Sequence, residues 1–211
     1  MKCDVCGQEY GLAHHCAGVA PTMTQEEAAP PPSGFAPGYY LGLAFDIARW
    51  DDVSIRRASR DSTAGYYGAL VWAVSAVVIL LSTALPGMLR AMPVPGPALV
   101  FGLVVGMTVG FVFIGIAAFI QIGLCHLIAK WFFGGKGTLV GILRPLLLAW
   151  FVNVLILIPI VGPLAAGIAW TAVLMLVFEE VEGIDRLRAF LIAAGINFCF
   201  LVLQFEIPMR H

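Results

Sequence analysis

Charged side chains are scarce in this chain. Lys, Arg, Asp and Glu make up 12% of the 211 residues, whereas soluble domains carry about 25%. Hydrophobic residues make up 60%, and the mean hydropathy is +0.92. The formal net charge is -1, without the basic patch that nucleic-acid-binding proteins carry. These values exclude a nucleic-acid partner and an ordinary soluble domain, and they predict an integral membrane protein.

Other absences narrow the class of protein further. Residues 1–61 contain no apolar run of the kind found in secretory signals, so we expect the amino end to stay in the cytosol. The stretch "GGKGT" does not fit GxxxxGK[ST], which argues against a nucleotide-binding loop. The apolar part holds a single histidine, His126. It contains no group of residues that could act as a catalytic nucleophile together with its general base. We therefore expect that the protein is not an enzyme.

The chain contains long apolar runs without charged residues. About 20 such residues in a helix cross a bilayer core about 30 Å thick. Two prolines in "IPIVGP" (158–163) split the third run, because proline interrupts a helix. The second run has no internal proline after Pro97, so we keep it as one long helix. The sequence predicts an all-α polytopic membrane protein. Its five transmembrane helices are expected at about residues 65–88, 97–131, 139–158, 163–180 and 186–206, within a domain of residues 62–206.

Basic residues are distributed unevenly over the connections between these helices. With the amino end inside, the inner segments carry all but two of the 12 Lys and Arg residues, and the outer segments carry only Arg90 and Arg210. Short basic loops resist translocation across the membrane. The distribution favours five spans, with the amino end in the cytosol and the carboxyl end outside.

Residues 1–18 have the composition of a small zinc knuckle. The CxxC turn of Cys3 and Cys6 is followed by His14, His15 and Cys16. Thiolate and imidazole are ligands that Zn²⁺ prefers, so three cysteines and one histidine would complete a closed structural site. Such a short stretch has no core, and bound metal would supply its folding energy. The alternative is a leader with incidental cysteines.

Two further segments join the knuckle to the spans. Residues 19–38 are rich in proline and small residues, which predicts a disordered, flexible linker. Residues 39–61 predict an amphipathic helix in the membrane interface. Its apolar face would carry Leu43, Ile47, Trp50 and Ala58. The alternative is a helix that packs on the cytosolic end of the bundle.

Four motifs follow one another along the apolar part. They are "FGGKGT" (133–138) after the long second helix, "IPIVGP" (158–163), Trp170 in the next span, and "EGIDRLRAFLIA" (182–193) before the last span. In this order they resemble the Yip1-domain family of five-span membrane proteins, over about residues 62–205. The knuckle resembles that of prokaryotic members of the family. The resemblance implies the five-helix fold, a prokaryotic cytoplasmic membrane and protein or lipid partners, and it brings no catalytic residues.

Ionisable residues at the predicted inner ends of the spans form a candidate site: His126, Lys130, Arg144, Glu179 and Glu180. His126 and Lys130 are four residues apart and would share one helix face. Arg144 precedes Pro145, which suits the first turn of a helix. Because the third and fourth spans would be antiparallel neighbours, we expect Arg144 to pair with Glu179 or Glu180. Such groups are functional candidates, although at helix ends they often only hold helices together.

Small and amide side chains predict contacts between helices. Gly102, Gly106 and Gly110 recur every four residues, which predicts a packing stripe on the second helix at the centre of the bundle. A homodimer seam, and so a homo-oligomer, is the alternative. Asn153 and Asn197 lie at similar depths in the third and fifth spans, where we expect hydrogen bonds across helices.

The sequence thus predicts a non-enzymatic membrane protein that organises protein partners or lipids at the cytosolic face. Its expected partners are membrane lipids and an unidentified cytosolic or membrane protein, with Zn²⁺ as a structural cofactor. The alternative is a transporter or lipid-translocating protein that uses the ionisable cluster. A continuous polar cavity that reaches the outer face would favour this alternative.

The knuckle yields the first testable prediction. The purified protein should contain about one zinc ion per chain, because the ligand set supplies one tetrahedral site. A variant with both Cys3→Ser and Cys6→Ser should lose the metal, as measured by elemental analysis. Equal zinc content in the two proteins would contradict the prediction.

Overall fold

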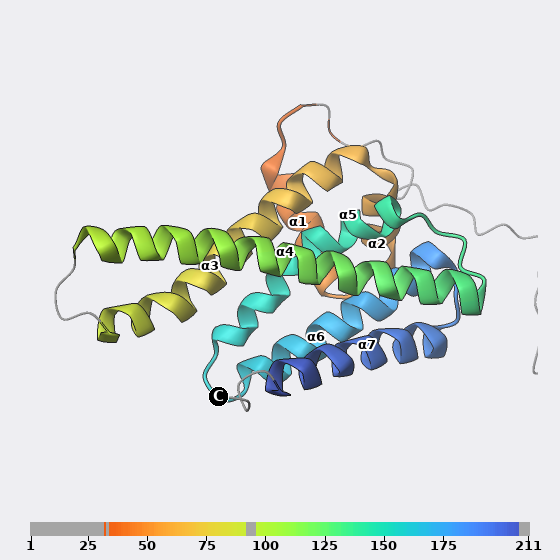
Figure 1. Cartoon of the computed structure of the whole chain (residues 1–211). Helices are drawn as coiled ribbons and strands as arrows, with labels where there is room; N and C mark the ends of the chain where they lie inside the picture. The colour runs from red at the N-terminus through yellow and green to blue at the C-terminus, as the bar shows by residue number, and fades with distance from the viewer. Residues whose placement is uncertain (1–31, 33, 92–95, 207–211) are drawn as a thin grey trace, which may run out of the picture. The chain divides into compact units, whose positions relative to one another are not determined.

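The computed structural model describes residues 32, 34–91 and 96–206, which lie in one unit, Pro32–His211 (Figure 1). The predicted zinc knuckle and almost all of the predicted linker lie outside the described residues. The described part is helical throughout. Its elements are α1 (Pro37–Ala48), α2 (Asp52–Arg60), α3 (Ser62–Ala91), α4 (Pro97–Phe133), α5 (Leu139–Ala149), the 3₁₀ helix η1 (Trp150–Leu157), α6 (Gly162–Val177), the π-helix η2 (Phe178–Glu182) and α7 (Arg186–Glu206).

Four stretches of the described part are long and apolar enough to cross a membrane. They are Ser62–Ala84, Val100–Phe133, Leu139–Leu157 and Gly162–Glu182. This result confirms the expectation of an all-helical membrane protein. The fifth predicted span coincides with α7, but the side chains of α7 are described only as far as Phe200, so this span remains a prediction.

The predicted interruption at "IPIVGP" occurs where the prolines indicated. η1 ends at Leu157, and α6 begins at Gly162. A Cβ atom at Gly162 would lie only 2.3 Å from the carbonyl oxygen of Leu155, so the turn needs glycine at this position. The tight turn makes the third and fourth spans antiparallel neighbours.

The helices form a closed circuit of contacts. α3 packs against α4, α5 and η1, η1 packs against α6, and α7 contacts both α6 and α4. Figure 1 shows α6 and α7 side by side. The third and fourth spans are the most buried, whereas only 6% of the window in α4 is buried. The prediction that the long helix forms the centre of the bundle is therefore wrong. The exposed apolar surface of α4 is what a helix facing lipid requires.

Two positions of the predicted glycine stripe on α4 are described, and one of them is a close contact between helices. A Cβ atom at Gly110 would meet Leu80 of α3 at 2.8 Å, whereas one at Gly106 would meet nothing within 4 Å. An equally close approach occurs at Gly68 of α3, where a Cβ atom would lie 2.8 Å from the Cβ atom of Leu147 on α5.

The predicted single amphipathic helix is two helices, because the chain bends between α1 and α2. Trp50 has a φ angle of +70°, and the side chain of Asp51 accepts a hydrogen bond of 2.8 Å from Ser54 N–H at the start of α2. Trp50 is 56% exposed and does not join the apolar face. Leu43, Ile47 and Ala58 are buried as expected. Both helices contact α5, so the packed alternative describes them better.

The order of the spans generates a prediction about the two sides of the membrane. Lys136 lies between the second and third spans, and Ile160 between the third and fourth. In a cysteine-free background, Lys136→Cys should react with an impermeant maleimide from the cytosolic side, and Ile160→Cys from the outside. His211→Cys should also be labelled from outside if α7 crosses the membrane. Labelling of positions 136 and 160 from the same side would contradict the arrangement.

Candidate functional site

The π-helix η2 is the centre of the most polar region among the described spans. Its sequence, FEEVE, carries three carboxylates, and each one contacts a different helix. Glu179 accepts a hydrogen bond from Arg186 Nε of α7 at 2.7 Å. Glu180 pairs with Arg56 of α2, and Glu182 pairs with His126 of α4. We call these three pairs, together with the loop of residues 134–138, the polar end.

Glu182 is the buried member of the polar end, with 1% of its surface exposed. One carboxylate oxygen contacts Nδ1 of His126, and the other accepts a hydrogen bond of 2.8 Å from Gly137 N–H. The backbone carbonyl of Glu182 also accepts a hydrogen bond of 2.9 Å from Lys136 N–H. Because a buried carboxylate is costly without partners, these contacts are what permits its burial.

The glycines of "FGGKGT" fit closely around this carboxylate. A Cβ atom at Gly135 would lie 2.5 Å from Oε2 of Glu182, and one at Gly137 would lie 2.8 Å from the carbonyl oxygen of Val181. Gly134 ends α4 in the left-handed region, with a φ angle of +70°. The glycines of this loop therefore make room for Glu182.

The ionisable residues predicted to form one cluster are only partly brought together. His126 is buried against Glu182, whereas Lys130, one turn later on α4, is exposed. Arg144 does not pair with Glu179 or Glu180, so that prediction is wrong. Its Nη1 atom donates a hydrogen bond of 2.9 Å to the carbonyl oxygen of Ser59. Pro145 lies inside α5 and not in its first turn.

Sequence reasoning did not select Glu182, although this residue is the most deeply buried carboxylate of the described part. Two signals were available. Glu182 begins the motif "EGIDRLRAFLIA", and the glycines of "GGKG" indicate that some group approaches the loop closely. Neither signal identifies the partner, because the contact joins residues 45 positions apart.

A second polar group lies inside the spans, nearer their middle. Gln121 of α4 accepts a hydrogen bond of 3.4 Å from Trp170 Nε1 of α6 and donates one to Asn197 of α7. Asn197 in turn donates to Thr171 Oγ1 at 2.6 Å. Asn197 therefore bonds across helices as expected. Asn153 does not, because its side chain donates to the carbonyl oxygen of Trp150 in its own helix.

Tyrosines hold α1 against the start of α3. The hydroxyl of Tyr40 donates a hydrogen bond of 2.7 Å to Asp61, and the ring of Tyr40 stacks on that of Tyr67 with centroids 4.1 Å apart. Burial, together with the bond to the Asp61 carboxylate, raises the pKa of Tyr40 to about 12. Its phenol is therefore neutral at physiological pH and serves as a hydrogen-bond donor that positions α1.

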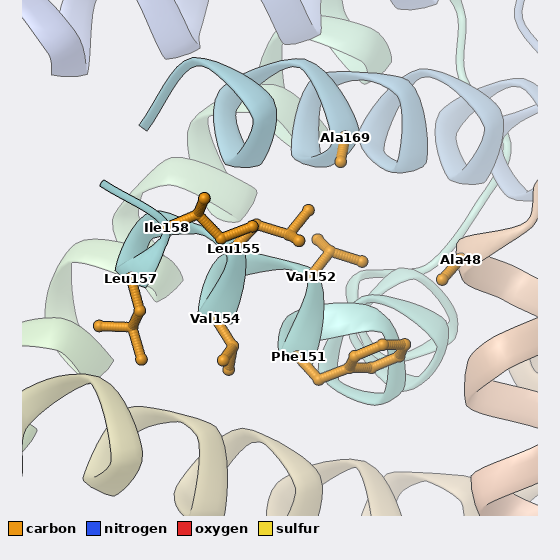
Figure 2. A pocket seen from close by; sticks show the side chains of 8 residues that line it. All are labelled: Ala48, Phe151, Val152, Val154, Leu155, Leu157, Ile158 and Ala169. Carbon is orange, nitrogen blue, oxygen red and sulfur yellow. The ribbon is translucent and has the colours of Figure 1, made fainter. Parts of the chain in front are cut away.

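A cavity beside the third span is apolar. It has a volume of about 610 Å³ and lies along η1 (Figure 2). Figure 2 shows Val152, Leu155 and Ile158 on the side of η1 that faces α6, where Ala169 projects toward them. A smaller cavity of about 160 Å³ between α3, α4 and α5 is also lined mainly by apolar side chains. Neither cavity offers convergent polar groups for chemistry.

Metal ligands are not grouped in the described helices. Within residues 32, 34–91 and 96–206, no three His, Cys, Asp or Glu side chains are placed to hold a metal ion. The predicted ligands Cys3, Cys6, His14, His15 and Cys16 lie outside the described residues, so the zinc site remains a prediction.

Comparison of the chain with protein-family models, with curated proteins and with solved structures finds no match. The resemblance to the Yip1-domain family therefore remains a prediction from the four motifs. The case for a function depends on the geometry of the polar end.

The burial of Glu182 yields a prediction about stability. Glu182→Ala should lower the free energy of unfolding by about 1–3 kcal/mol or more, because it leaves buried partners unsatisfied. The control is Glu179→Ala, whose partner Arg186 has a side chain 59% exposed. Solvent-exposed pairs contribute only about 0–1 kcal/mol. Denaturation in mild detergent measures both variants.

A double-mutant cycle extends this test to the pair itself. His126→Ala combined with Glu182→Ala should lose less stability than the sum of the two single variants, because either change already breaks the contact. If Glu182→Ala is no more destabilising than Glu179→Ala, the inference that the contacts of buried Glu182 stabilise the protein more than the Glu179 pair is wrong.

Proposed function

We propose that this protein is a non-enzymatic integral membrane protein whose polar end organises protein partners or lipids at the cytosolic face of the membrane. The resemblance to the Yip1-domain family implies this class of function. The proposal includes a prokaryotic cytoplasmic membrane, α7 as a fifth span and an amino-terminal zinc knuckle as a small docking element on a flexible linker.

One observation supports the proposal most directly. The three carboxylates of η2 contact α2, α4 and α7, so one turn of helix joins the ends of elements that are far apart in the chain. The loop of residues 134–138 is held on the same turn by two hydrogen bonds to Glu182. Such a region is a fixed surface with exposed side chains around it, and a surface of this kind suits the recognition of protein partners or lipids.

The alternative, a transporter or lipid-translocating protein, has less support. A transport route requires polar groups that can exchange partners along a path through the membrane. Gln121, Asn197 and Thr171 are bonded to one another. Both described cavities have apolar linings. These observations favour a structural use of the intramembrane polar groups, as hydrogen bonds that hold α4, α6 and α7 together.

Site-specific photo-crosslinking in native membranes tests the proposal. A photoreactive amino acid is placed at Lys136 or Leu187 of the polar end and, as a control, at Ile160, which is 97% exposed and lies at the opposite end of the spans. We expect discrete protein or lipid adducts from positions 136 and 187 that do not form from position 160. The variant Glu182→Gln should weaken adducts from position 136, because it removes the charge that holds the loop. The same adducts from both ends, or none from the polar end, would contradict the proposal.

A further inference from the structure

Three exposed cations at the polar end belong to none of its ion pairs. Glu179, Glu180 and Glu182 are each paired, and Asp185 accepts a hydrogen bond of 3.1 Å from Leu187 N–H in the first turn of α7. The exposed cations are Lys130, Lys136 and Arg188. Within the described part of the chain, none of them forms an ion pair with a carboxylate. Their charge is therefore available to an external anion.

One of these cations lies over an aromatic ring, and a second lies one helical turn before that ring. The guanidinium carbon of Arg188 is 5.8 Å from the centroid of the Phe133 ring, which is a cation–π contact. Lys130 is three residues before Phe133 on α4, and residues at this spacing lie on the same side of a helix. Phe133 is half-buried and packs against the core, so it gives the guanidinium a fixed support. Lys130 and Arg188 therefore belong to the same end of α4.

The pair lies at one end of a candidate membrane span. Phe133 is the last residue of the span Val100–Phe133. The neighbouring Trp131 and Phe132 are each 74% exposed, as is common where a helix leaves the hydrocarbon layer. Farther inside the span, α4 exposes apolar side chains that include Leu124 and Leu127. The surface therefore offers cations at the end of the span and, next to them, an apolar strip for acyl chains.

We propose that Lys130 and Arg188 bind the phosphate of an anionic phospholipid whose acyl chains lie along α4. The planar guanidinium of Arg188 presents paired donors to phosphate oxygens, and Lys130 adds a point charge. The exposed apolar strip favours a lipid over a free phosphate or a phosphopeptide. This inference rests on the proposed function, since it specifies a lipid as one ligand of the polar end.

Binding of lipid to the full-length protein in uncharged detergent tests the inference. Native mass spectrometry and thermal stability are measured with dioleoyl phosphatidylglycerol, with dioleoyl phosphatidylcholine and with inorganic phosphate alone. We expect preferential binding and stabilisation by phosphatidylglycerol. Arg188→Gln and Lys130→Gln should each weaken its binding about tenfold, the size of effect expected for losing one charge-assisted hydrogen bond. Arg188→Lys should retain part of the affinity, because it keeps the charge and loses the planar fork.

Arg49→Gln is the matched control. It removes the same charge from an exposed residue at the end of α1, outside the polar end. It should change phosphatidylglycerol binding less than twofold. Phe133→Leu keeps an apolar side chain and removes the ring, so it should weaken binding without loss of folded protein. Melting temperatures without lipid verify that each variant is folded.

Three outcomes would overturn the inference. They are equal binding of the two lipids, equal losses in the Arg49→Gln, Lys130→Gln and Arg188→Gln variants, and stabilisation by inorganic phosphate that equals that by phosphatidylglycerol. The photo-crosslinking experiment separates this result from the broader proposal. If protein adducts from positions 136 and 187 persist while lipid selectivity is absent, the lipid site is wrong and the organising role stands.

Discussion

The burial of one carboxylate, Glu182, constrains much of the polar end. A carboxylate that is removed from water needs hydrogen-bond donors, and the protein supplies them from His126 and from the backbone of the loop. The loop can approach only because residues 135 and 137 have no side chains that would collide with Glu182 or Val181. The same π-helix directs Glu179 and Glu180 toward α7 and α2. The contacts of one short helical turn, η2, therefore help to position α2, α4 and α7.

The class of protein and the edges of its described spans could be predicted from the sequence, because they depend on local properties. Hydropathy reports the scarcity of charged residues directly. The prolines of residues 158–163 interrupt the helix whatever elements pack around it. The bend at Trp50 could also have been predicted from the sequence. Asp51 is a residue type that often caps the start of a helix, but the apolar periodicity across residues 43–58 suggested one continuous helix.

The ion pairs could not be predicted, because they depend on non-local geometry. Residue spacing places Arg144 opposite Glu179 and Glu180 only if the fourth span is a regular α-helix to its end. Between these residues the chain instead contains the 3₁₀ helix η1 and the start of the π-helix η2, and both depart from the register of a regular α-helix. The glycine stripe on α4 was overestimated for a related reason. Lipid and neighbouring helices are both apolar, so hydropathy cannot tell Gly106, which meets nothing, from Gly110, which meets Leu80.

The 3₁₀ helix η1 adjusts the length of a span without changing its number of residues. The third span has 19 residues, which as an α-helix would extend about 28 Å at about 1.5 Å per residue. Eight of them belong to η1, where the rise is about 2.0 Å per residue, so the same span reaches about 32 Å. Both lengths are close to the thickness of a hydrocarbon layer, about 30 Å. Thr138 caps the start of the span and the glycine turn follows its end, so η1 places this turn about 4 Å farther from Thr138 than a regular α-helix would. The third span therefore gains length by a change of helix type, whereas the longer α4 must tilt or protrude.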